Sequence, residues 1–232
     1  LYLMSALGEL PKLDAVVFAD TQYEPKQVYQ HLEWLKSLNT GIPIYRVTAG
    51  NIKEDALHSK VGARLGENGD FSAASLPYYT SRGGMIKRQC TSYYKIRPIH
   101  KKIRELAGYK PYERIPIGTI ELWLGISMDE QRRVRQSREH WITNIYPLIF
   151  SKPMNRQDCL NWMAQHNYPH PPRSACLCCP FHSDTEWRNI QNSPEEWKNV
   201  VAFDEKIRHL DSLNEELFLH KSLKPLKNID FR

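Results

Sequence analysis

The chain of 232 residues has no long apolar run, no internal repeat and no long low-complexity segment. Because no stretch approaches the roughly 20 apolar residues that span a bilayer, the sequence predicts no transmembrane helix and no membrane partner. The opening LYLMSALGEL is too short and too acidic for a secretory signal, so we expect a cytoplasmic protein. The hydrophobic share of 41% and the charged share of 25% are typical of an ordinary globular protein.

Cysteine is scarce and unevenly distributed. Only five cysteines occur, four of them lie in the last third of the chain, and none follows Cys179. In a reducing compartment such clustering favours metal binding or thiol chemistry over disulfides. Cys176 and Cys179, within the stretch RSACLCCPFH, have the CxxC spacing that lets two sulfurs reach one metal centre.

Basic residues gather in two groups, although the formal net charge is only +6. One group comprises Lys87, Arg88, Lys95, Arg97, Lys101, Lys102 and Arg104, and the other comprises Arg132, Arg133, Arg135 and Arg138. A single run of this kind is as consistent with a solvated helix face as with a binding site. Two runs flanking one candidate site favour an anionic partner, either a nucleotide or a nucleic acid.

Short apolar stretches alternate with helical patterns in the first part of the chain. The run from Leu13 to Asp20 is typical of a buried parallel strand whose carboxyl end presents Asp20 and Thr21 to a crevice. A helix is predicted from Pro25 to Leu38 and a second strand over residues 42–47. This alternation predicts an α/β fold with a parallel sheet flanked by helices.

The remaining elements follow from periodicity and turn residues. We expect helices over 2–10, 90–107 and 156–166, a strand over 121–127, a helix after the turn at Ser127, a mobile loop or lid over 62–84, and a mostly helical end over 194–219.

The order of motifs resembles the phosphoadenosine phosphosulfate (PAPS) reductase-like branch of the PP-loop, or adenine-nucleotide α-hydrolase, superfamily. FADTQYEP (18–25) is similar to that family's strand-end segment DTG…P. LGISMDEQRRVRQS (124–137) and the following YPL (146–148) are similar to its next two motifs. Cys176 and Cys179 match the pair that closes the iron–sulfur motif of the reductases. The resemblance extends over most of the chain.

This resemblance implies a Rossmann-like domain of the PP-loop type over residues 1–150 and a helical, cysteine-rich region over 151–232. It implies ATP and Mg²⁺ as ligands. The family's Ser/Gly-rich phosphate loop is not visible in the sequence, and we expect it to precede residue 1. The expected nucleotide or anion contacts are Asp20, Thr21, Gly125, Arg133, Arg135 and Arg138.

The resemblance also implies a [4Fe–4S] cluster. Its expected ligands are Cys90, Cys159, Cys176 and Cys179. The family often combines an adjacent Cys–Cys pair with a CxxC, so the separation of the first two ligands is a departure. Zinc held by Cys176, Cys179, His182 and one more thiol stays open, as do a redox dithiol and simply packed free cysteines. Cys178 could carry a persulfide, serve as a spare ligand or pack.

Assimilatory sulfonucleotide reductases, which the chain also resembles, share a nucleophilic cysteine near the chain end. No cysteine follows Cys179 in this sequence. We therefore expect an ATP pyrophosphatase of the sulfurtransferase type, with Asp20 and Cys178 as catalytic candidates. The expected acceptor is DNA or tRNA, and the expected partner is a cysteine desulfurase or another sulfur donor. A PAPS or adenylyl-sulfate reductase using an external thiol and a non-catalytic nucleic-acid-binding subunit are the alternatives. Whether the chain forms a homo-oligomer stays open.

Overall fold

The computed structural model describes residues 1–58, 76–210 and 215–231. These residues form two compact units, each assembled from three chain segments. Unit 1 comprises 1–17, 30–45 and 101–172, and unit 2 comprises 18–29, 46–100 and 173–232. Among the described residues, no helix is long and apolar enough to cross a membrane. The division at residue 150 that the family resemblance implies stays a prediction.

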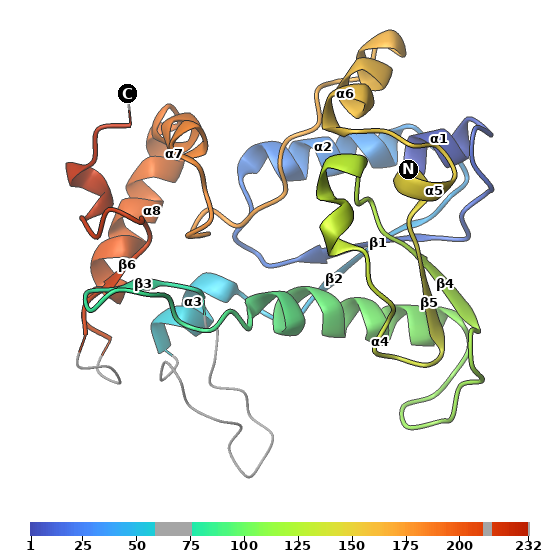
Figure 1. The fold of residues 1–232 in the computed structure, drawn as a ribbon, viewed down its shortest axis with the longest axis horizontal. Coiled ribbons are helices and arrows are strands. Elements are labelled where there is room, and N and C mark those ends of the chain that lie inside the picture. Colours follow the sequence, from blue (N-terminus) through green and yellow to red (C-terminus); the bar gives the residue numbers. More distant parts are fainter. Residues whose placement is uncertain (59–75, 211–214, 232) are drawn as a thin grey trace. The chain divides into compact units, whose positions relative to one another are not determined.

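Unit 1 is built around a parallel strand pair. β4 (Ile120–Trp123) pairs with β5 (Ile142–Ile145), and Figure 1 shows the two strands side by side. Its helical elements are α1 (Tyr2–Ala6), the 3₁₀ helix η2 (Met128–Arg133), α5 (Pro147–Phe150) and α6 (Arg156–Gln165). A capping box formed by Asn155 and Asp158 fixes the start of α6, since each side chain satisfies a backbone N–H of the first turn.

Unit 2 has a larger apolar core, and most of its regular secondary structure is helical. Its complete helices are α3 (Ile52–His58), the π helix η1 (Thr91–Ile96), α7 (Asp184–Gln191), α8 (Pro194–Ile207) and the 3₁₀ helix η3 (Leu226–Asn228). The short strands β3 (Tyr79–Thr80) and β6 (Leu217–Phe218) pair antiparallel. Trp187 and Phe203 are fully buried in this core, which also contains the cysteine segment 176–178.

Four elements begin in one unit and end in the other along the sequence. They are β1 (Val16–Asp20), α2 (Lys26–Ser37), β2 (Ile44–Thr48) and α4 (Arg97–Leu106). β1 pairs with β2. The carboxyl end of β1 and the loop after it belong to unit 2, where they meet the cysteine segment.

The prediction of a mixed α/β fold with a helical, cysteine-bearing C-terminal region is confirmed. The described strands form three two-stranded sheets. The helix expected after Ser127 is a 3₁₀ helix that ends at Arg133, so Arg135 and Arg138 lie outside it. The C-terminal helix ends at Ile207, earlier than predicted, and Leu217 and Phe218 belong instead to a strand that pairs with β3. Most of the expected lid, 62–75, lies outside the described residues.

Candidate functional site

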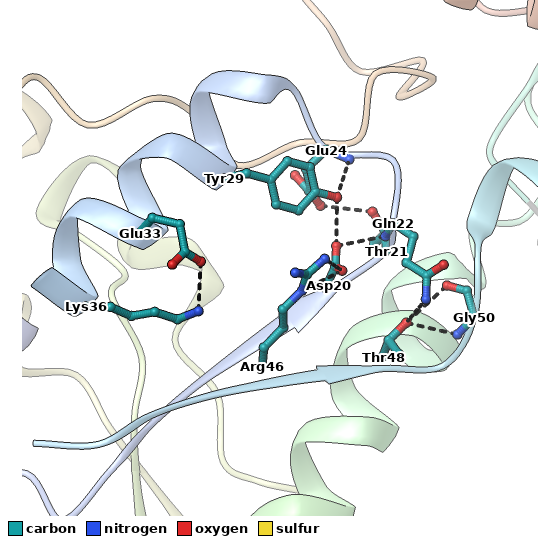
Figure 2. A network of polar contacts seen from close by, with 10 residues as sticks. All are labelled: Asp20, Thr21, Gln22, Glu24, Tyr29, Glu33, Lys36, Arg46, Thr48 and Gly50. Atoms are coloured by element: carbon teal, nitrogen blue, oxygen red, sulfur yellow. Dashed lines mark hydrogen bonds and ion pairs between the residues drawn. The ribbon is translucent and has the colours of Figure 1, made fainter.

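At the carboxyl end of β1, both oxygens of the Asp20 carboxylate accept hydrogen bonds from neighbouring residues. Asp20 is 1% exposed, and its Oδ1 accepts hydrogen bonds from the Tyr29 hydroxyl and the Gln22 backbone N–H, both at 2.8 Å. Its Oδ2 accepts from Arg46 Nε at 2.9 Å and Nη2 at 2.5 Å. Burial and the bond to Asp20 raise the pKa of Tyr29 to about 12. Figure 2 shows these groups converging on Asp20, which thereby fixes the start of the loop after β1.

A second carboxylate in the same loop collects donors from three parts of unit 2. Glu24 is buried, and its Oε1 accepts from the Thr21 hydroxyl at 3.2 Å and from the Lys95 ammonium at 3.3 Å. The Cys176 sulfur lies 3.6 Å from Oε1, and the Ser174 hydroxyl lies 3.3 Å from Oε2. Because a buried carboxylate needs a counter-charge and hydrogen bonds, Glu24 ties these segments together.

The cation of this cluster comes from the π helix η1. Burial of Lys95 by itself lowers its pKa, but the facing Glu24 carboxylate outweighs burial, so the pKa is raised. Lys95 therefore keeps its charge beside Glu24. π-helical turns are rare and recur at functional sites.

Cys176 is docked against the loop after β1. Its sulfur lies 3.2 Å from Thr21 Oγ1, and the next backbone N–H, of Leu177, donates to the Tyr23 carbonyl at 2.8 Å. Burial and the Glu24 carboxylate raise the pKa of the Cys176 thiol to about 12. At neutral pH the side chain is therefore a protonated thiol that donates toward oxygen acceptors.

Three further thiols share this region of unit 2. Cys178 is fully buried, and burial together with the charges of Cys176, Cys179 and Cys90 raises its pKa well above the ordinary value. Cys90 and Cys179 are half-buried, and burial followed by the charge of Cys179 raises the pKa of Cys90. The structure thus brings Cys90, predicted as a ligand from a distant part of the sequence, to the cysteine segment.

Positive charges in unit 2 act on the pKa of Cys179. Burial raises the pKa of its thiol, while Arg173, Lys95 and Arg88 act in the opposite direction. Two of these cations have carboxylate partners of their own: Arg173 pairs with Glu186 and Lys95 with Glu24.

The fourth predicted ligand, Cys159, belongs to unit 1. It lies on α6 and packs against a buried apolar cluster that includes Leu148, Met154 and Trp162. Burial raises the pKa of its thiol. No other cysteine belongs to the described part of unit 1, so the packing there is that of a small apolar residue.

Unit 2 contains the thiols that a metal centre would require. Among the described residues, no three His, Cys, Asp or Glu side chains are placed to hold a metal ion. Two buried polar atoms near the thiols nevertheless have no partner: the hydroxyl of Tyr78, whose pKa burial and then Cys178 and Cys90 raise, and Nδ1 of His182. His182 Nε2 lies 3.0 Å from the Cys176 carbonyl. Thiols are the donors that iron–sulfur clusters use, so the donor type fits such a cluster, although the described side chains are not placed to hold a metal ion.

The remaining predicted contacts lie in unit 1. Arg133, Arg135 and Arg138 are exposed; Arg133 pairs with Glu130, and the Arg135 backbone exchanges hydrogen bonds with the Tyr146 hydroxyl. Gly125 has no positive φ, and a Cβ there would stand 3.8 Å from Leu1, an ordinary contact. Nothing in its backbone requires glycine.

Sequence reasoning missed Glu24, Lys95 and Arg46. Glu24 could have been found as the second carboxylate of FADTQYEP, whereas Lys95 gave no signal beyond its membership of a basic run. Arg46 lies on β2 and reaches Asp20 only because β1 and β2 pair. In comparisons with known proteins, no family model, no curated protein and no solved structure matches this chain.

Proposed function

We propose that this chain is a PAPS reductase-like, PP-loop-type enzyme that uses ATP and Mg²⁺ to activate an acceptor in a nucleic acid and then replaces oxygen by sulfur. The observation that carries the proposal is the contact between its two most distinctive motifs. The Thr21 hydroxyl of FADTQYEP lies 3.2 Å from the Cys176 sulfur of the cysteine segment. A nucleotide at the carboxyl end of β1 would therefore lie beside the thiols.

The thiols would hold a [4Fe–4S] cluster. Within unit 2 the available ligands are Cys90, Cys176 and Cys179, with Cys178 beside them. When bound, such a cluster supplies a thiophilic centre at which sulfur can be delivered. The Thr21 hydroxyl and the Glu24 carboxylate hold Cys176 in place, and Lys95 pairs with Glu24.

The proposed reaction consists of two displacements, first of pyrophosphate and then of AMP. The acceptor oxygen attacks the α-phosphorus of ATP and pyrophosphate leaves, with Mg²⁺ on the phosphates. The outer sulfur of a persulfide, supplied by a cysteine desulfurase or a similar donor, then attacks the activated atom, and AMP leaves with the oxygen. A second thiol of the donor cleaves the remaining S–S bond, forms a disulfide and releases the thiolated product, and its proton passes to solvent.

A labelled-sulfur assay tests this proposal. Anaerobically purified protein is incubated with ATP, Mg²⁺, a cysteine desulfurase, radiolabelled cysteine and either RNA or DNA. We expect pyrophosphate release and labelled nucleic acid, both dependent on ATP. Label without ATP dependence, or pyrophosphate release without label, contradicts the proposal. Glu33→Gln, an exposed position outside the site, serves as the matched control for Glu24→Gln.

A sulfonucleotide reductase is the second candidate, and one observation favours it. The positive charges of Arg173, Lys95 and Arg88 act against burial on the pKa of the half-buried Cys179 thiol, and positive charge near a thiol suits a sulfate group. Sulfite release from PAPS or adenylyl sulfate in the presence of thioredoxin, with no sulfur in nucleic acid, would select this candidate.

A further inference from the structure

A well-braced loop in unit 1 connects α4 to β4 over residues 107–119 and is visible as a green arm between them (Figure 1). Arg104 Nε donates to the Lys110 carbonyl at 2.9 Å, and its terminal nitrogen donates to the Glu113 carbonyl. The Glu113 carboxylate accepts from the Lys110 backbone N–H at 2.8 Å. Ile115 is 2% exposed, and its carbonyl lies 3.2 Å from His140 Nε2. The buried Ile115 and the hydrogen bonds of Arg104 and Glu113 therefore hold the loop in one conformation.

The same loop turns two large apolar side chains outward. Tyr112 is 103% exposed and Ile117 is 84% exposed, the two highest values among the exposed large hydrophobic residues of the described chain. Tyr112 also has a φ of 65°, in the left-handed region that bulky residues rarely adopt. A tyrosine there gains no burial and carries backbone strain, so packing does not explain it.

The charges around Tyr112 are those of a polyanion-binding surface. Lys110 and Arg114 flank it at two residues on either side, both are exposed, and neither side chain has an ion pair within the described chain. The adjacent Glu113 carboxylate, which accepts from the Lys110 backbone N–H, offsets part of this positive charge. Lys101 adds an exposed positive charge on α4.

We propose that the loop 107–119 binds a single-stranded part of a nucleic acid, with an unpaired base stacked on Tyr112 and phosphates contacted by Lys110 and Arg114. An aromatic ring stacks on any base, but only where the base is not already stacked in a duplex. Lysine and arginine supply the sequence-independent phosphate contacts. This inference rests on the proposed nucleic-acid acceptor and adds the surface that holds it.

Binding is measured by fluorescence anisotropy with labelled single-stranded RNA and DNA of about 16 nucleotides, a length within the usual site size. Tyr112→Ala should weaken binding of at least one strand type by about 5- to 150-fold, the range expected for one stacked base. Tyr112→Phe keeps the ring and should bind as the wild type does. Lys110→Ala with Arg114→Ala should lower the slope of log affinity against log salt by about 0.7 for each lost contact.

Because Tyr112 is fully exposed, neither Tyr112 variant should lower the thermal midpoint, which separates lost binding from lost folding. Equal binding by Tyr112→Ala and the wild type overturns the inference, as does absence of binding by the wild type; a protein-binding loop would give the first result. Iron content and ATP binding of the same preparations report on the proposed function separately. The loop inference can therefore fail while that function stands.

Discussion

The cysteines of the two units lie in different surroundings. In unit 1, Cys159 packs against apolar side chains of one cluster. In unit 2, Cys176 contacts a hydroxyl and a carboxylate, and three more thiols lie near it. Cys176 and Cys178 also belong to an apolar core, but Cys176 contacts polar groups in addition, whereas Cys159 packs as a small apolar residue. The proposed function therefore places its chemistry in unit 2.

The largest effect should come from removing a thiol of unit 2. Cys176→Ser should abolish iron binding, because it deletes the sulfur docked on the loop after β1. Cys159→Ser should keep most of the iron, since it changes only apolar packing in unit 1. Iron and acid-labile sulfide are measured on both variants after anaerobic purification.

The reverse order would break the comparison. If Cys159→Ser loses its iron as completely as Cys176→Ser, the ligand set predicted from the sequence is right and the assignment to unit 2 alone is wrong. Circular dichroism on both variants shows that each has folded.

The next effect concerns the two carboxylate pairs. Glu24→Gln leaves Lys95 without its counter-charge in a largely buried site. Solvent reaches about one-third of the Lys95 side chain and reduces the penalty, so we expect a loss of about 2–3 kcal/mol in the free energy of unfolding. Glu33→Gln, in the exposed pair with Lys36, should change it by less than about 0.5 kcal/mol. Urea unfolding of both variants measures the difference, and equal losses would contradict a structural role for Glu24.

A smaller loss is expected at the end of β1. Asp20→Asn removes the charge that Arg46 and Tyr29 engage, but Arg46 is about half exposed, so we expect a loss of about 1–2 kcal/mol. Arg46→Met should show a loss that is not additive with Asp20→Asn in a double-mutant cycle. Additive losses would mean that the two side chains act independently.

Much of the local structure around these sites could be predicted from the sequence. The run ending at Asp20 gave β1, and the periodic pattern after Pro25 gave α2, because apolar spacing reports local structure directly. The strands β3 and β6 could not be predicted, since two-residue strands have no periodicity and form only through their pairing. Arg135 and Arg138 follow the 3₁₀ helix because its last turn closes at Arg133.

The candidate site was predictable only in its motifs. The CxxC spacing pointed to Cys176 and Cys179, and the strand end pointed to Thr21. The Glu24–Lys95 pair joins residues 71 positions apart, so nothing local in the sequence signals it. Cys159 lies on α6 and packs against the apolar cluster of unit 1, and that packing depends on tertiary contacts that the local sequence does not signal.

The smallest effect is a pH dependence of the metal-free protein. The folded-state pKa of Cys176 is raised to about 12, and that of Lys95 is also raised. The contribution of these two groups to the free energy of unfolding is therefore fully present below their ordinary pKa values of 9.0 and 10.5. It is lost as the pH rises from those values through the folded-state values. Between pH 9 and 10 we expect a loss of about 1 kcal/mol. Cys176→Ala should flatten this slope in urea titrations at each pH, and an unchanged slope would contradict the burial of the thiol.

Elemental analysis of the anaerobically purified wild-type protein tests most directly the claim that the thiols of unit 2 form a cluster site. The proposal predicts a brown protein with iron and acid-labile sulfide in equal amounts and little zinc. A colourless protein with one zinc per chain and no sulfide would contradict it.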